Sequence, residues 1–259
     1  MKVVLFCGGL GTRLREHSET IPKPMVNIGY RPLIWHLMKY YSHFGHNEFI
    51  LCLGYRGDVI KRYFLDYDEC LSNDFTLSQG GRDVQLARSD IQDWRITFVD
   101  TGLHANLGQR LKAVEAHLAG EEVFMANYSD GLTDLHLPTY LEEFRQRDVI
   151  GSFLCAQSTQ SFHLVDVDDG GLVRQVRGAR EAGLWINGGF FVFKRAIFDV
   201  IEPGEELVEQ PFGRLIERKE LLGYRYTGFW SCMDTFKDKQ RFDEMEARGD
   251  TPWQVWKTV

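Results

Sequence analysis

The sequence predicts an α/β fold in which helices flank a mostly parallel sheet and a small β-rich extension follows in the carboxyl-terminal half. Short apolar runs alternate with stretches of helical periodicity over the first half of the chain. The first apolar run leads directly into a glycine-rich turn, whereas the second half has short apolar runs separated by glycine turns. Strand–helix alternation of this kind is typical of a parallel sheet covered on both faces.

The first half is expected to alternate strands and helices. Apolar residues spaced three and four apart predict helices, and glycines at 45 and 120 end the first and last of them. Buried strands are expected over residues 3–6, 49–53, 95–99 and 123–126. Helices are expected over residues 32–44, 59–65 and 111–118. In such a sheet, ligands bind beyond the carboxyl ends of the strands.

The second half is expected to begin with a β-hairpin. Its strands cover residues 163–167 and 172–176, joined by the Asp-Asp-Gly-Gly turn at 168–171. A strand over 190–193, a helix over 196–201 and a polar-faced helix over 238–248 are also expected. No linker or repeat interrupts the pattern, so we expect one domain over residues 1–259, with halves at 1–135 and 136–259.

Composition limits the function classes. The 259 residues are 44% hydrophobic and 26% charged, with a formal net charge of −7. An acidic chain is poorly suited to sequence-independent binding of nucleic acid or of an anionic membrane. The five cysteines are scattered and form no Cys-x-x-Cys pair, and no apolar run approaches the ~20 residues of a membrane span. A cytoplasmic location is therefore expected.

The turn after the first strand carries a candidate phosphate site. Residues 8–14 read Gly-Gly-Leu-Gly-Thr-Arg-Leu. Glycines let backbone N–H groups approach a phosphate chain, and a following helix directs its positive end there. The P-loop spacing is absent, and Leu14 stands where a dinucleotide-binding turn needs a small residue, which disfavours a dehydrogenase. The residues expected at the phosphates are Gly8, Gly9, Gly11, Thr12 and Arg13.

A second cation follows about ten residues later. Pro22 and Pro24 fix an extended backbone around Lys23, which can aim its ammonium group at a polyphosphate. The planar guanidinium of Arg13 and the compact charge of Lys23 suit a phosphorus centre that gains negative charge, so both are candidate catalytic residues. A tight strand–helix turn with two solvated cations is the alternative interpretation.

Together these motifs resemble those of the nucleoside-diphospho-sugar pyrophosphorylases, also called sugar nucleotidyltransferases. The resemblance rests on Gly-Gly-x-Gly-Thr-Arg-Leu followed by Lys-Pro-Met. Later segments, among them Ile-Asn-Gly-Gly-Phe-Phe at 186–191 and Gly-Phe-Trp at 228–230, favour the glucose-1-phosphate cytidylyltransferase branch. The resemblance implies a Rossmann-like, GT-A-like nucleotidyltransferase fold. It also implies that residues 1–135 bind the nucleotide and residues 136–259 bind the acceptor.

The resemblance also implies a metal and a base-recognition segment. Members of the family hold a catalytic Mg²⁺ with two aspartates, which correspond here to Asp130 and Asp234. Asp130 follows a predicted strand, and carboxylate oxygens suit Mg²⁺. Capping or turn-forming roles are the alternative for both. Thr101 and Arg110 lie in the segment that helps to recognise cytosine in the family, although Gln109 replaces its usual second glycine.

The implied reaction transfers a nucleoside monophosphate to a phosphorylated acceptor. An acceptor phosphate oxygen attacks the α-phosphorus of the triphosphate in line with the leaving pyrophosphate. Mg²⁺, Arg13 and Lys23 supply charge neutralisation, and no general base is needed. CTP is the favoured triphosphate, with UTP or dTTP as alternatives, and the family resemblance suggests a homo-oligomer.

The acceptor side departs from the family pattern. Relatives normally carry Glu-Lys-Pro shortly before Asn-Gly-Gly, whereas residues 176–181 here read Val-Arg-Gly-Ala-Arg-Glu. An arginine can replace the lysine at a phosphate. The residues expected at the acceptor are Arg177, Arg180, Trp185, Asn187 and Gly188, with Trp230 as a further apolar wall. The acceptor is therefore glucose 1-phosphate or another, even non-sugar, phosphate, and a catalytically silent regulatory subunit is the remaining alternative.

Overall fold

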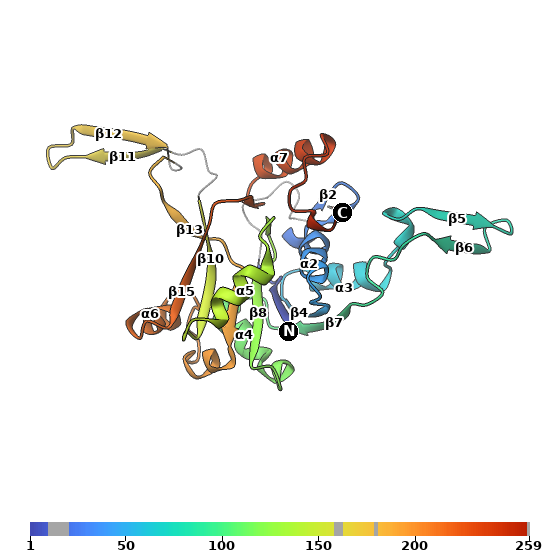
Figure 1. Ribbon diagram of the computed structural model, residues 1–259, viewed down its shortest axis with the longest axis horizontal. Helices are drawn as coiled ribbons and strands as arrows, with labels where there is room; N and C mark the ends of the chain where they lie inside the picture. The colour runs from blue at the N-terminus through green and yellow to red at the C-terminus, as the bar shows by residue number, and fades with distance from the viewer. Residues whose placement is uncertain (10–20, 158–162, 179–180, 258–259) are drawn as a thin grey trace.

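A computed structural model describes residues 1–9, 21–157, 163–178 and 181–257 of the chain. Within that part, the centre is a sheet of eight strands with helices on both faces (Figure 1). Strand β1 (Val3–Phe6) runs parallel to β4 (Glu48–Leu53) on one side and to β8 (Val123–Tyr128) on the other, and β7 (Arg95–Asp100) continues parallel beyond β4. The predicted parallel core is confirmed.

The second half extends this sheet with strands of mixed direction. Strands β14 (Phe191–Lys194), β10 (Gly151–Gln157) and β13 (Trp185–Asn187) follow β8 in antiparallel order. Strand β15 (Leu221–Tyr226) pairs with β10 in parallel. Strands from the two halves of the chain thus share one sheet. The larger helices are α2 (Leu33–His43), α3 (Gly57–Leu65), α4 (Leu107–Ala113), α5 (Leu137–Arg145), α6 (Gln210–Glu217) and α7 (Phe236–Ala247).

Both faces of the sheet are buried. Neighbouring residues of a strand point to opposite sides, so each central strand contributes side chains to both faces. On β1, Val3 and Leu5 belong to one hydrophobic cluster, and Val4 and Phe6 belong to another. Helices α2, α3, α5 and α7 cover the first cluster, whereas α4 and α6 cover the second. This burial on two sides explains why the central strands read as continuous apolar runs rather than as alternating patterns.

Two hairpin arms project from the body in different directions (Figure 1). The hairpin predicted in the second half is confirmed as β11 (His163–Val167) and β12 (Val173–Gly178). A hairpin not predicted from the sequence, β5 (Phe75–Ser78) and β6 (Asp83–Leu86), forms the other arm. Each arm carries two cross-strand pairs of exposed apolar side chains: Phe75–Leu86 and Leu77–Val84, and Val165–Val176 and Val167–Val173.

The predicted helix over 111–118 differs from the observed one. Helix α4 begins at Leu107 because Asn106 and Gln109 form a reciprocal capping box, in which each side chain accepts from the other residue's backbone N–H at 2.9 Å. The helix ends at Ala113, and a separate 3₁₀ turn covers Glu115–Leu118. Likewise, the helix expected over 196–201 is a 3₁₀ segment at Arg195–Asp199.

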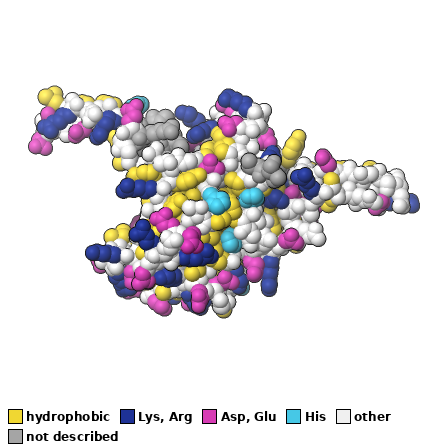
Figure 2. All heavy atoms as spheres, in the orientation of Figure 1, with side chains coloured by type: hydrophobic (Ala, Val, Ile, Leu, Met, Phe, Trp, Pro, Cys, Tyr) yellow, Lys and Arg dark blue, Asp and Glu magenta, His cyan; other side chains and the backbone are white. Residues whose placement is uncertain are grey.

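Lysine and arginine side chains are interspersed with aspartate and glutamate over the face shown in Figure 2. None of the helices in the described part of the chain is long and apolar enough to cross a membrane.

Candidate active site

A cavity of about 610 Å³ opens at the carboxyl ends of β1 and β8. This is the edge at which ligands bind in open α/β sheets. Residues following both strands line it, together with the start of α4 and residues of the carboxyl-terminal half. The lining residues are Phe6, Cys7, Gly8, Gly9, Lys23, Pro24, Ala105, Asn106, Leu107, Arg110, Tyr128, Ser129, Asp130, Ile186, Asn187, Glu206, Trp230, Cys232 and Asp234.

A short antiparallel ladder brings the two predicted metal ligands together. Strand β9 (Gly131–Thr133) starts directly after Asp130, and β16 (Trp230–Cys232) ends just before Asp234. Because β9 and β16 run antiparallel, with Cys232 opposite Gly131, the start of one lies beside the end of the other. The Met233 N–H donates to the Asp130 carbonyl at 2.8 Å and extends the ladder to the aspartates themselves.

Lys23 joins both carboxylates. Its Nζ lies 2.6 Å from Asp130 Oδ2 and 2.5 Å from Asp234 Oδ1. The lysine begins the 3₁₀ turn Lys23–Met25, in which Pro24 and Met25 are buried and anchor the segment. Burial alone would lower the pKa of Lys23, but the two carboxylates outweigh it and hold the pKa above its ordinary value. The lysine is therefore charged, and its ammonium lies between the two carboxylates.

The donor set is suited to a hard divalent cation. Two carboxylates face one position at the mouth of a polar cavity, and oxygen is the ligand that Mg²⁺ prefers. Among the described residues, no group of three or more histidine, cysteine, aspartate or glutamate side chains gathers to hold a metal. A cation at this position would depend on water and substrate oxygens for its other ligands, as is common for Mg²⁺.

The glycine-rich turn is described only in its first part. Gly8 and Gly9 line the cavity, whereas Gly11, Thr12 and Arg13 lie outside the described residues. A Cβ atom on Gly8 would stand 2.0 Å from Arg110 Nη1, so a side chain there would displace the guanidinium. The predicted close backbone approach at Gly8 therefore has a physical basis, although its nearest neighbour is Arg110.

Arg110 is held by protein atoms. It is 4% exposed, and its Nη1 donates to the Leu53 carbonyl at 3.1 Å and to Thr101 Oγ1 at 2.7 Å. Its Nη2 donates to the carbonyls of Gly8 at 3.1 Å and Leu103 at 3.4 Å. Burial lowers the pKa of Arg110 below its ordinary value. In this structure Arg110 and Thr101 tie the glycine turn to the ends of β4 and β7, and base recognition by them stays a prediction.

The predicted acceptor residues are partly assembled. Asn187 lines the cavity, and its Nδ2 donates to the Tyr128 hydroxyl at 3.3 Å. Gly188 supports the wall, because its carbonyl accepts from the Trp230 indole at 2.9 Å. The cavity lining includes Trp230 but not Trp185, which lies on β13 with Arg225 5.7 Å above its ring.

Only one of the two predicted acceptor arginines is described, and it lies away from this cavity. Arg177 is exposed on strand β12 of the projecting arm and does not line the cavity. Arg180 lies outside the described residues. Their contact with an acceptor phosphate stays a prediction.

Sequence reasoning missed Tyr128 and Glu206, which both line the cavity. Tyr128 is the last residue of β8 and directly precedes the Ser-Asp-Gly segment, so its position could have identified it as a site residue. Burial, followed by the carboxylates of Asp130 and Glu206, raises the pKa of its phenol, which keeps its proton. Glu206 lies in the segment before α6, in no motif, and nothing local marks it.

Comparisons with known proteins agree with this geometry. The family model described as "Nucleotidyl transferase" matches residues 2–230. The chain is 36% identical to the glucose-1-phosphate cytidylyltransferase of Salmonella typhi, over 99% of this chain and 100% of that protein. It is also 36% identical to a protein of Bacillus subtilis (strain 168) named as a probable glucose-1-phosphate cytidylyltransferase, with the same coverage.

Solved structures share the fold at lower identity. A UDP-glucose pyrophosphorylase in complex with UDP-glucose superimposes with a TM-score of 0.67, covering 96% of this chain and 98% of that one. Sequence identity in that comparison is 16%, so the likeness concerns the fold.

Proposed function

Because the chain belongs to the nucleotidyl transferase family, we propose that it transfers CMP from CTP to glucose 1-phosphate or a related sugar phosphate and releases pyrophosphate. The proposed substrates follow the cytidylyltransferases that match the chain over its full length at 36% identity. The single observation that carries the proposal is the convergence of Lys23, Asp130 and Asp234 at the mouth of the cavity.

The proposed metal is Mg²⁺, held by Asp130 and Asp234. Their fit is supported by the two carboxylates that face one position at the cavity and by the oxygen-only donor set. When bound, the ion neutralises charge on the triphosphate and on the reacting phosphorus. Lys23 occupies the position between the carboxylates here, so we expect its ammonium to turn toward the phosphates when nucleotide and metal bind.

The chain's own residues position the reactants. The backbone at Gly8 and Gly9 borders the phosphates, and Lys23 places a compact positive charge beside them. The Tyr128 hydroxyl accepts from Asn187 and keeps its own proton to donate to the acceptor. Arg13, by prediction, adds a second cation. The acceptor phosphate oxygen forms the new P–O bond as the α–β bridging bond breaks, and pyrophosphate carries away the electron pair.

A second acceptor class is favoured by one observation. The Glu-Lys-Pro pattern is absent from residues 176–181, where the chain reads Val-Arg-Gly-Ala-Arg-Glu. Cytidylyl transfer to a phosphate other than glucose 1-phosphate, including a non-sugar phosphate, is therefore the second candidate. The intact Lys23–Asp130–Asp234 cluster argues against a silent regulatory subunit.

A product screen tests the proposal. The purified chain is mixed with Mg²⁺, each of CTP, UTP, dTTP, ATP and GTP, and a panel of phosphorylated acceptors, and pyrophosphate and product mass are measured. We expect CTP with glucose 1-phosphate to give CDP-glucose. A different CDP-linked product would select the second candidate, and no pyrophosphate with any pair would leave the silent-subunit alternative.

A homo-oligomer is part of the proposal. Each hairpin arm exposes four apolar side chains on cross-strand pairs, and an isolated two-stranded hairpin is only marginally stable in water. Covering both arms with a second copy would bury these side chains. Light scattering after size-exclusion chromatography is expected to give a multiple of the 30.0 kDa chain mass, and a monomer at micromolar concentration would refute it.

A further inference from the structure

We propose that the Glu206 carboxylate accepts a hydrogen bond from the exocyclic amino group of the nucleotide base, and thereby selects cytosine over uracil and thymine. The inference deepens the proposed function and rests on it in one respect, because it assumes that a pyrimidine nucleotide occupies the cavity described above. It assigns base selection to a residue outside every motif recognised in the sequence.

The segment that carries Glu206 packs directly on the start of α4. A Cβ atom on Gly108 would stand 2.2 Å from the Glu205 carbonyl, so only glycine allows this approach. Asn106 Nδ2 donates to the Gly204 carbonyl at 2.9 Å, and the Leu107 N–H donates to Glu206 Oε2 at 3.4 Å. These contacts fix Glu206 at the rim of the cavity that Asn106, Leu107 and Arg110 also line.

The carboxylate of Glu206 is incompletely satisfied. Its Oε1 is buried and has no hydrogen-bond partner in the described part of the chain. The neighbouring Glu205 differs, because both of its oxygens accept from Arg214, Oε1 at 2.9 Å and Oε2 at a shorter distance. A buried acceptor without a partner is costly, so such a group on a residue that lines a ligand cavity points to a donor supplied by the ligand.

Charge decides which part of a nucleotide faces Glu206. A carboxylate accepts only, so it repels the triphosphate, which pairs instead with the Lys23 ammonium of the same cavity. The base and the ribose are the neutral parts that offer donors. Cytosine presents an amino group at C4, whereas uracil and thymine present a carbonyl oxygen that a carboxylate repels. Pairing of glutamate or aspartate with cytosine N4 is an established mode of base recognition.

The test compares nucleotide affinity rather than turnover, so that it does not depend on the acceptor. Isothermal titration measures binding of CTP and UTP to the full-length chain and to Glu206→Gln, in Mg²⁺ and without acceptor. The glutamine amide can donate to the uracil O4, so the ratio of CTP to UTP affinity is expected to fall about 10- to 100-fold, the discrimination of one well-placed base contact. Glu205→Gln is the matched control and is expected to leave the ratio unchanged.

Two further measurements keep the proposal falsifiable. A CTP analogue with hydrogen in place of the C4 amino group should bind the unaltered protein about 10-fold or more weakly than CTP, which tests the contact without a variant. Glu206→Gln should discriminate between CTP and dCTP as the unaltered protein does. If it instead loses CTP and UTP affinity equally and no longer distinguishes dCTP, Glu206 reads the ribose and the proposal is overturned.

The outcomes separate this inference from the proposed function. Formation of a CDP-linked product with an unchanged affinity ratio in Glu206→Gln would overturn the role of Glu206 alone. A Glu206-dependent preference for CTP without any product would overturn the proposed transfer reaction alone.

Discussion

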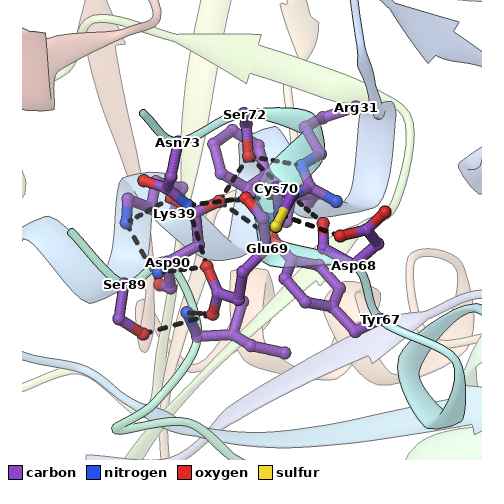
Figure 3. A network of polar contacts seen from close by, with 12 residues as sticks. Arg31, Lys39, Tyr67, Asp68, Glu69, Cys70, Ser72, Asn73, Ser89 and Asp90 are labelled. Atoms are coloured by element: carbon purple, nitrogen blue, oxygen red, sulfur yellow. Dashed lines mark hydrogen bonds and ion pairs between the residues drawn. The ribbon is translucent and has the colours of Figure 1, made fainter. Parts of the chain in front are cut away.

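Two buried clusters of charged side chains differ in how their charges are balanced. Around Arg31, two cations serve one carboxylate: Asp90 Oδ2 lies 3.3 Å from the Arg31 guanidinium, and Asp90 Oδ1 lies 3.6 Å from Lys39 Nζ (Figure 3). Around Lys23, the contacts of the described residues place one ammonium group against the two carboxylates of Asp130 and Asp234.

The Arg31 cluster also has uncharged hydrogen-bond partners within the protein. Asp90 also accepts from the hydroxyls of Tyr67 at 3.0 Å and Ser72 at 2.5 Å, and Arg31 donates to the Asp68 carbonyl at 2.7 Å (Figure 3). The first cluster is thus complete within the protein. Arg31, Lys39 and Asp90 also line a second cavity, but the Asp90 carboxylate is already paired with two cations and two hydroxyls. In the described part of the chain, Asp130 and Asp234 meet at the Lys23 ammonium in the cavity described above. A carboxylate with many protein partners indicates a structural role, and two carboxylates that meet at a cavity indicate a binding role.

The largest expected effect is a loss of turnover when either Asp130 or Asp234 loses its carboxylate. Asp130→Asn and Asp234→Asn are each expected to lower kcat on the order of 10³-fold, because each removes a ligand charge that acts on the transition state. Stability should change little, since each substitution also removes repulsion between the two carboxylates. Pyrophosphate release measures turnover, and thermal unfolding measures stability. Near-normal turnover in both variants would contradict a binding role for the two aspartates.

The next effect is on stability when the complete cluster is broken. Arg31 is 2% exposed, and Arg31→Met should lower the free energy of unfolding by about 3 kcal/mol, because it removes the nearer cation of Asp90 together with the hydrogen bonds to Asp68 and Ser72. Turnover should stay within about twofold at a temperature where the variant is folded. Urea denaturation measures the loss. Arg56→Met, which breaks an exposed ion pair with Asp58, is the control and should cost under about 1 kcal/mol.

Replacing Lys23 should make thermal stability depend more strongly on Mg²⁺. Lys23→Met removes the only described ammonium that pairs with both aspartates, so the variant is expected to unfold at a lower temperature in a chelator and to recover more than the unaltered protein when Mg²⁺ is added. Turnover should fall on the order of 10²-fold. An equal Mg²⁺ response in both proteins would count against a metal between the carboxylates.

The smallest expected effect is a pH dependence of the free energy of unfolding, caused by His36 near the Arg31 cluster. Burial, with smaller contributions from the charges of Lys257 and Arg31, lowers the pKa of His36 to about 4, and its Nε2 lies 3.0 Å from the Ile28 carbonyl. A folded-state pKa below the unfolded value near 6.5 means that its contribution is complete above pH 6.5 and is lost as pH falls toward 4. His36→Gln should reduce the loss of unfolding free energy between pH 7.5 and 5.5 by about 1 kcal/mol, measured by urea denaturation. An unchanged pH profile would contradict the buried neutral histidine.

The parallel core could be predicted, and the glycine turn and Lys23 could be recognised as candidates, because each depends on a local pattern. The runs around Val3 and Phe49 are apolar on two sides, and the glycine turn and Lys23 follow one another in sequence. The pairing of Asp130 with Asp234 required the family resemblance, since their proximity arises from a ladder between segments far apart in the chain.

Other features left no sequence signal strong enough to predict them. The arm with Phe75 and Leu77 was missed because its apolar residues do not join a core and alternate with polar ones over only four positions. Helix α4 was predicted four residues late, since Gly108 read as part of a loop although it serves close packing against Glu205. Glu206 was missed because its importance depends entirely on which segment it packs against.

The antiparallel ladder between β9 and β16 also has a bearing on biosynthesis. A ribosome that has delivered the first two hundred or so residues has already supplied the parallel core and Lys23, but not the strand that ends before Asp234. Until that strand emerges and docks, the nascent chain holds Lys23 and Asp130 without Asp234. Under the proposed function, one of the two metal-holding carboxylates is therefore supplied only in the last steps of synthesis.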